Sequence, residues 1–131
     1  GQAMTETITV AVAATAVTGK KAFFQISGAT IAGSATVVVI GTSDVLGLPV
    51  RVFNVGYVVS VKSNSTLAND AGTFVAADTA VATAATGDVR GTYVPTTTSD
   101  GTVRTVMTIS LPAIAVGPNA TRVGALGVTQ A

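Results

Sequence analysis

Residues 100–111, Asp-Gly-Thr-Val-Arg-Thr-Val-Met-Thr-Ile-Ser-Leu, decide the fold class of this chain. Apolar and polar residues alternate along this stretch, and a period of two is typical of a half-buried β-strand. The alternation predicts an inner face formed by Val103, Met107, Ile109 and Leu111. Asp-Gly is a preferred pair for a tight turn, so Asp100-Gly101 ahead of this run is the strongest hairpin signal of the sequence. The stretch therefore predicts β structure.

A second alternating run covers residues 50–62 and predicts the longest strand. Its inner face is expected to carry Phe53, Val55, Tyr57, Val59 and Val61. Gly56 lies in the middle of the run and indicates a bulge or a close approach of another backbone. Both runs are long enough to lie centrally in a sheet. We therefore expect the core to contain Val55, Tyr57, Val59, Val103, Met107 and Ile109.

Weaker β patterns fill most of the remaining chain. Residues 5–17 alternate, and residues 35–40 form a continuous β-branched run of the kind found in strands covered on both faces. Further strands are expected at residues 23–26, 88–94 and 122–128. Residues 73–87 fit either a short helix capped by Asp78 or extended chain, and their Thr and Val residues favour extended chain. About eight or nine short strands without a long helix predict an all-β fold, an antiparallel β-sandwich or barrel.

The length of 131 residues is that of a single domain. Gly1-Gln2-Ala3-Met4 resembles vector-derived sequence ahead of a natural start at Met4, so residues 5–131 are interpreted as one β domain, with room for terminal arms. No basic segment precedes the first apolar stretch, as a secretory signal requires. Threonine interrupts every apolar run before it reaches the roughly 20 residues of a membrane helix. We therefore expect neither a secretory leader nor a contact with the membrane.

Chemically active residue types are scarce in this sequence. It has no Cys, His or Trp, and its charged residues are seven basic and six acidic ones. Disulfides, thiolate nucleophiles and every site that needs imidazole are thereby excluded. We expect no enzymatic activity and hence no catalytic, cofactor-binding or metal-binding residues. The scattered basic residues also give no electrostatic footprint for nucleic acid.

The carboxylates are the remaining candidates for chemistry. A glycosidase needs two of them facing each other across a cleft, and the residues that would have to meet are Glu6, Asp44 and Asp100. The other three acidic residues, Asp70, Asp78 and Asp88, lack the spacing of a calcium-binding loop. Roles in turns and caps are the favoured interpretation for all of them.

Low charge sets the expected character of the surface. Charged residues make up 10% of the chain, less than half of the usual value of about 25%. A surface of Thr, Ser, Gly, Asn and Ala, with few lysines to guard strand edges, suits contact with a neighbouring molecule, so we expect a homo-oligomer. The first candidate contact surface is the edge of the 5–17 strand, with Thr5, Thr7 and Thr9. The second is an exposed apolar tip formed by Leu46, Leu48 and Pro49. Most aromatic side chains are expected in the core.

The second half of the chain carries Ala84-Ala85-Thr86-Gly87-Asp88-Val89-Arg90-Gly91-Thr92-Tyr93-Val94-Pro95, followed by the strand pattern of residues 102–112. In these segments, and in its cysteine-free composition rich in Ala, Thr, Gly and Val, the chain resembles the small head decoration (cement) proteins of tailed bacteriophages. The resemblance implies a subunit, often a trimer, that binds the major capsid protein outside the expanded head and braces it. It also implies synthesis in the bacterial host cytoplasm and a final place on the capsid surface. The chain departs from the family in showing no proline-rich N-terminal arm.

A surface or tail-fibre β-domain that binds a carbohydrate or a receptor is the alternative from another functional class. Exposed aromatic residues would favour it, whereas self-association and binding to assembled shells would favour the decoration protein. An enzyme ranks below both. An ice-binding role ranks last, because the T-x-T triplets at residues 5–9 and 96–98 form no ranked array.

Overall fold

The computed structural model describes residues 4–11, 15–35, 37–64, 68–78 and 83–110. These residues form five strands and a short 3₁₀ helix, and they contain no α-helix. The elements in chain order are β1 (Leu46–Gly47), η1 (Val55–Tyr57), β2 (Val58–Ser63), β3 (Thr73–Val75), β4 (Thr92–Val94) and β5 (Thr105–Ile109). The predicted all-β class is therefore confirmed for the described part of the chain.

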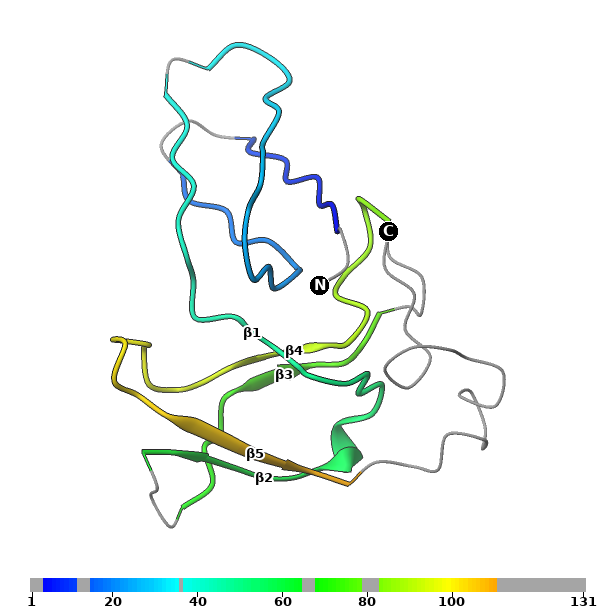
Figure 1. Ribbon diagram of the computed structural model, residues 1–131, viewed down its shortest axis with the longest axis vertical. Coiled ribbons are helices and arrows are strands. Elements are labelled where there is room, and N and C mark those ends of the chain that lie inside the picture. The colour runs from blue at the N-terminus through cyan, green and yellow to red at the C-terminus, as the bar shows by residue number, and fades with distance from the viewer. Residues whose placement is uncertain (1–3, 12–14, 36, 65–67, 79–82, 111–131) are drawn as a thin grey trace.

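The strands form two antiparallel sheets. One has the order β1–β4–β3, with Tyr93 of β4 opposite Leu46 on one side and Phe74 on the other. The second sheet pairs β2 with β5, with Val61 opposite Met107. Figure 1 shows the two sheets as adjacent layers, while the chain before β1 extends away from both of them.

The hydrophobic core lies between the two sheets. Its centre is a cluster of the buried residues Leu48, Val52, Val61 and Tyr93. Partly buried residues from both sheets and from η1 pack against this cluster, namely Val50, Tyr57, Val58, Phe74, Met107 and Ile109. The core is small, and none of the described residues before β1 belongs to it.

Two predicted core residues lie outside the core, because the 50–62 run is not one continuous strand. Asn54 caps η1: its side chain accepts a hydrogen bond from the Gly56 amide (2.8 Å), and this local bond competes with strand pairing. The register of β2 against β5 then shifts between Val58 and Ser60, which leaves Val59 as the extra residue of a bulge. Val55 and Val59 are both 61% exposed. The prediction holds better for the remaining four residues, which are all half-buried: Tyr57, Val103, Met107 and Ile109.

The hairpin predicted at Asp100-Gly101 is wrong, although the turn is present. The Asp100 carboxylate accepts hydrogen bonds from the amides of Thr102 (2.8 Å) and Val103 (2.9 Å), and Gly101 has a φ of 83°. The strand that follows, β5, nevertheless pairs with β2 and not with the preceding β4. The turn therefore carries the chain from one sheet to the other.

Three predicted strands are not formed in the described residues. No strand is formed by residues 5–11, by residues 23–26 or by the described part of 35–40. The run of residues 37–40, predicted to be covered on both faces, is exposed on both. In the ambiguous segment 73–87, β3 favours extended chain at residues 73–75, and none of the described residues is helical; residues 79–82 lie outside the described part. The predicted strand at 122–128 also lies outside it.

Candidate interaction surface

The N-terminal segment is attached to the rest of the molecule by a polar anchor around Glu6 and Lys21. The Glu6 carboxylate accepts hydrogen bonds from the backbone amides of Lys20 (2.5 Å) and Lys21 (3.2 Å). The Lys21 ammonium is buried and donates to the carbonyl oxygens of Thr5 (2.8 Å) and Thr83 (2.5 Å). A buried ammonium is costly unless such acceptors surround it, so these bonds fix three separate segments of chain together.

A second polar anchor lies next to the first, around Asp88 and Arg90. The Asp88 carboxylate is buried, accepts a hydrogen bond from the Ala22 amide (3.1 Å) and forms an ion pair with Arg90 (3.3 Å). The Arg90 guanidinium also donates to the Ala22 carbonyl oxygen (3.2 Å). Both backbone groups of Ala22 are thus held by side chains of the segment just before β4.

The segment that leaves this anchor carries an unusual concentration of exposed apolar side chains. We call residues 23–43 the apolar arm; residue 36 lies outside the described part. Together with Ala22 the arm forms the longest uncharged run of the sequence. Eight of its large hydrophobic side chains are exposed: Phe23, Phe24, Ile26, Ile31, Val37, Val38, Val39 and Ile40. In Figure 1 the arm stands away from both sheets.

Four consecutive residues show how little of the arm is covered. The side chains of Val37, Val38, Val39 and Ile40 are between 49% and 87% exposed. Neighbouring side chains of an extended chain point to opposite sides, so exposure of all four means that neither side is buried. Large contiguous apolar surfaces of this kind are typical of sites that contact another molecule.

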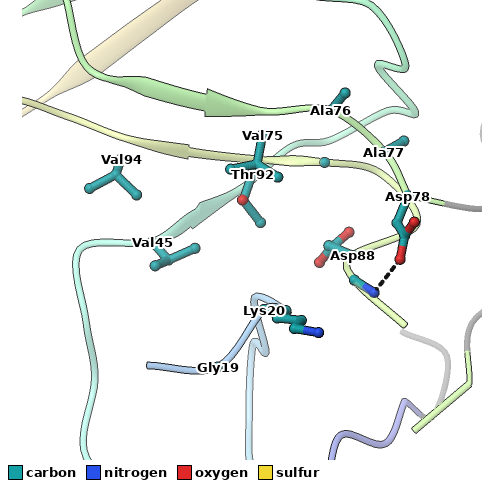
Figure 2. A pocket seen from close by; sticks show the side chains of 12 residues that line it. Gly19, Lys20, Val45, Val75, Ala76, Ala77, Asp78, Asp88, Thr92 and Val94 are labelled. Carbon is teal, nitrogen blue, oxygen red and sulfur yellow. Dashed lines mark hydrogen bonds between the residues drawn. The ribbon is translucent and has the colours of Figure 1, made fainter. Parts of the chain in front are cut away.

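A pocket of about 630 Å³ opens between the base of the arm and the three-stranded sheet (Figure 2). Its walls are mostly apolar and are formed by Val45, Val75, Ala76, Ala77 and Val94. Lys20, Asp78 and Asp88 contribute charged groups to the lining, and the Asp78 carboxylate accepts a hydrogen bond from the Gly87 amide (2.7 Å). The pocket therefore combines an apolar interior with charges of both signs.

Gly91 shapes the wall of this pocket. Its φ of 94° lies in the left-handed region that favours glycine, and an added Cβ would come within 2.8 Å of the Val75 carbonyl oxygen. The absence of a side chain lets the start of β4 approach β3 closely.

A second, smaller hollow of about 350 Å³ surrounds Asp70. The Asp70 carboxylate accepts hydrogen bonds from the Ser63 hydroxyl (2.6 Å), the Tyr93 hydroxyl (3.0 Å), and the Gly72 and Thr96 amides (2.8 and 3.1 Å). The hydrogen bond from Ser63, assisted by those from Thr96 and Tyr93, holds the pKa of Asp70 well below its usual range. Burial, together with this carboxylate, raises the pKa of the Tyr93 hydroxyl.

The Asp70 carboxylate has a structural role, because both of its oxygens accept hydrogen bonds from groups of the same chain. Other carboxylates are engaged in the same way. Asp44 accepts from the Ser99 amide (2.9 Å), and the hydrogen bonds from Thr102 lower the pKa of Asp100. Turn and anchoring roles thus account for the described acidic residues. Within the described residues no group of three or more potential metal-ligating side chains occurs, and no helix is long and apolar enough to cross a membrane.

The predicted contact residues are placed differently from one another. Thr5, Thr7 and Thr9 are exposed, and the Thr7 amide donates to the Ala84 carbonyl oxygen (2.8 Å). Leu46 is half-buried in β1, and Pro49 is exposed. The prediction of Leu48 in an exposed tip is wrong: its side chain is 3% exposed and belongs to the core, because the pairing of β1 with β4 turns it inward.

Sequence reasoning missed the apolar arm as the most exposed apolar surface of the described chain. The signal that would have found it is the run of residues 22–43 without a charge. Most aromatic side chains were expected in the core, yet Phe23 and Phe24 are both exposed, Phe24 fully.

Comparison of the chain with protein-family models, with curated proteins and with solved structures finds no match.

Proposed function

We propose that this protein is a structural decoration (cement) protein that binds the outer face of a phage head and stabilises it, as a homo-oligomer, most simply a trimer. The observation that carries the proposal is the apolar arm, an uncharged segment with eight exposed large hydrophobic side chains and a polar anchor at its base. The partner is the major capsid protein, and the protein reaches the capsid surface after synthesis in the host cytoplasm.

The energy available from covering the arm supports an adhesive role. Burial of a fully exposed Val, Ile or Phe side chain contributes about 1.5–3 kcal/mol, so covering eight of them yields at most roughly 12–24 kcal/mol before costs. Association itself costs an estimated 4–15 kcal/mol or more in lost freedom. One arm therefore suffices for modest affinity. An oligomer that presents several arms to a repetitive shell multiplies this affinity through effective concentration.

The backbone of the arm supports the same role. Residues 37–40 are β-branched and have no strand partner within the described chain, and such a segment can add to the edge of a neighbouring sheet. We propose that the arm and residues 5–11 become strands on assembly. The sandwich of eight or nine strands that the sequence predicts would then be completed only in the assembled state.

A second candidate function is favoured by one observation. Phe23 and Phe24 are adjacent exposed aromatic side chains, and exposed aromatic residues are the usual platform for carbohydrate rings and for receptor contacts. This observation supports a surface or tail-fibre domain that binds a carbohydrate or a receptor.

Two measurements test the proposed function. Light scattering after size exclusion should show an oligomer, and the protein should bind expanded phage heads that lack their decoration protein and raise their melting temperature. Because the arm carries no charge, binding should persist in about 0.5 M salt, where the Debye length falls to a few ångström. A Val37→Lys, Val39→Lys double variant should lose binding, whereas Val55→Lys, at an exposed position outside the arm, should retain it.

A different result would contradict the proposed function. A protein that remains monomeric at high concentration and neither binds nor protects expanded heads at low or high salt is not a cement protein. Binding of the same monomer to a glycan array, lost in a Phe23→Ser, Phe24→Ser variant, would establish the second candidate function instead.

A further inference from the structure

We infer that copies of this protein contact each other through Phe24 of one copy, which inserts into the pocket beside Lys20 on the next copy. This inference deepens the proposed function, on whose oligomeric state it rests. It assigns the contact between subunits to one side chain and one pocket.

The first argument is the complementarity of the two surfaces. Among the described residues, Phe24 is the most exposed large hydrophobic side chain, and the pocket has mainly apolar walls around about 630 Å³. A buried phenyl ring removes 150–250 Å² from water, as typical magnitudes go, so a single ring makes a substantial contact. The aliphatic walls at Val45, Val75 and Val94 match such a ring chemically (Figure 2).

The second argument is that Phe24 is held close to a fixed point. Ala22 is hydrogen-bonded through its amide to Asp88 and through its carbonyl to Arg90. Two residues of extended chain reach at most about 7 Å, so the Phe24 ring can explore only a small region beyond this anchor. A side chain restricted in this way loses less conformational freedom on docking than one on a free loop.

The third argument is electrostatic. Lys20 is exposed and lines the pocket, where its ammonium can meet the face of an inserted phenyl ring in a cation–π contact. No charged residue of the arm opposes this arrangement, since residues 22–43 carry none. The surfaces that meet are different on the two copies, so the contact is head-to-tail, and a closed ring such as a trimer satisfies every copy.

The absence of cysteine from the sequence makes a direct test possible. A chain with Phe24→Cys and a second chain with Ala76→Cys, an exposed residue of the pocket wall, each carry a single thiol. Mixed under mild oxidation, they should give mainly the disulfide-linked heterodimer. A mixture in which Phe24→Cys is combined with Val55→Cys, exposed but not in the pocket lining, is the matched control and should give no excess of heterodimer.

Variants without thiols provide an independent measurement. Phe24→Ser should weaken self-association at least about tenfold in light scattering, as loss of a central aromatic contact does, whereas Val55→Ser should leave it unchanged. Ala76→Trp, which fills the pocket, should have the effect of Phe24→Ser. Circular dichroism spectra like that of the parent chain would show that the variants are folded.

The outcomes separate this inference from the proposed function. If Phe24→Ser remains oligomeric and still protects expanded heads, the assignment of the contact is wrong and the cement function stands. If a chain with both Phe24→Cys and Ala76→Cys closes its disulfide within one molecule at high dilution and no cross-link between copies forms, the ring occupies its own pocket and the inference fails. If the parent protein is monomeric and binds no heads, both proposals fail.

Discussion

Replacing Asp70 with asparagine should lower the free energy of unfolding by about 2–4 kcal/mol at pH 7, since hydrogen bonds to a charged group are stronger than neutral ones. Four donors meet Oδ1 of Asp70, and the Ser63 hydroxyl meets Oδ2. A charged hydrogen bond contributes about 1.5–3 kcal/mol and a neutral one about 0.5–1.5 kcal/mol, so each of the five bonds loses about 1 kcal/mol. Solvent screens the half-buried carboxylate, which reduces the sum to about 2–4 kcal/mol. Asparagine keeps the acceptor at Oδ1, and the Ser63 hydroxyl can rotate to accept from the new amide. The variant therefore loses the charge but little of the geometry.

The pH dependence of this effect has a definite sign. The pKa of Asp70 in the folded protein lies below its ordinary value of 3.8, so the native state binds fewer protons than the unfolded state as the pH falls past that value. The stability that the carboxylate contributes is complete above this pH and is lost progressively below it. The difference between the parent protein and Asp70→Asn should consequently narrow from pH 5 down to pH 2.5. The Asp70→Asn variant retains Asp100, whose pKa is also lowered, so its stability still decreases at low pH, but less than that of the parent protein.

Urea unfolding followed by circular dichroism at several pH values measures both effects. Asp78→Asn is the matched control, because Asp78 is exposed and its carboxylate accepts a hydrogen bond from the Gly87 amide. We expect it to cost less than about 1 kcal/mol at pH 7. Equal losses for the two variants at pH 7, or a difference from the parent that stays constant down to pH 2.5, would refute the reasoning.

Three further predictions concern the core, the sheet and the anchor. Val52→Ala, at a fully buried side chain, should cost about 2–3 kcal/mol in denaturant unfolding, whereas Val59→Ala on the bulge should cost less than about 0.5 kcal/mol. Gly72→Ala should weaken the pairing of β3 with β4 and speed hydrogen exchange there, because its Cβ would lie 2.2 Å from a carbonyl oxygen of β4. Gly28→Ala is the control and should be neutral, because no atom lies within 4 Å of the added Cβ. Lys21→Met should release the N-terminal segment, seen as faster proteolytic cleavage before residue 20 with β5 still protected.

The sequence predicted where strands form better than it predicted which of their side chains face the core. Alternation located β2 and β5 correctly, since a period of two reflects the geometry of one strand. It failed at Val59, where one inserted residue shifts the register against β5, and at Val55, which lies in η1, whereas Tyr57 still packs against the core. Asn54 was the residue that signalled the change, as its side chain competes with strand pairing.

Partners of the strands were beyond the reach of local patterns. Asp100-Gly101 has the chemistry of a turn and forms one, but a turn does not determine which strand the chain joins next. Residues 95–104 are long enough to carry the chain to the other sheet, where β5 pairs with β2. Pairing is decided by which arrangement buries Tyr93 and Val61 together, and this depends on the whole fold.

The exposed apolar surface was not located by the sequence. Low charge predicts contact with a neighbouring molecule, and this stays a prediction. The predicted tip contains the buried Leu48, while the exposed apolar residues lie on the arm. Leu48 and Val37 are both apolar residues in short apolar runs, and only the tertiary contacts distinguish them. The length of an uncharged run is the better guide, because a long segment without charges has no residue that must remain in water.

Charge and apolar surface are divided between the base of the arm and the arm itself, and this division has a physical consequence. Glu6, Lys21, Asp88 and Arg90 all hold the base, and Lys21 and Asp88 are buried, where salt screens their contacts much less than on the surface. The arm has no charge to screen, and its burial is strengthened by salts that are excluded from the protein surface. Neither the attachment of the arm nor the contact that we propose between the arm and a neighbouring molecule should therefore weaken as ionic strength rises. A contact made by surface ion pairs would behave in the opposite way, so the salt dependence of adhesion distinguishes the two mechanisms.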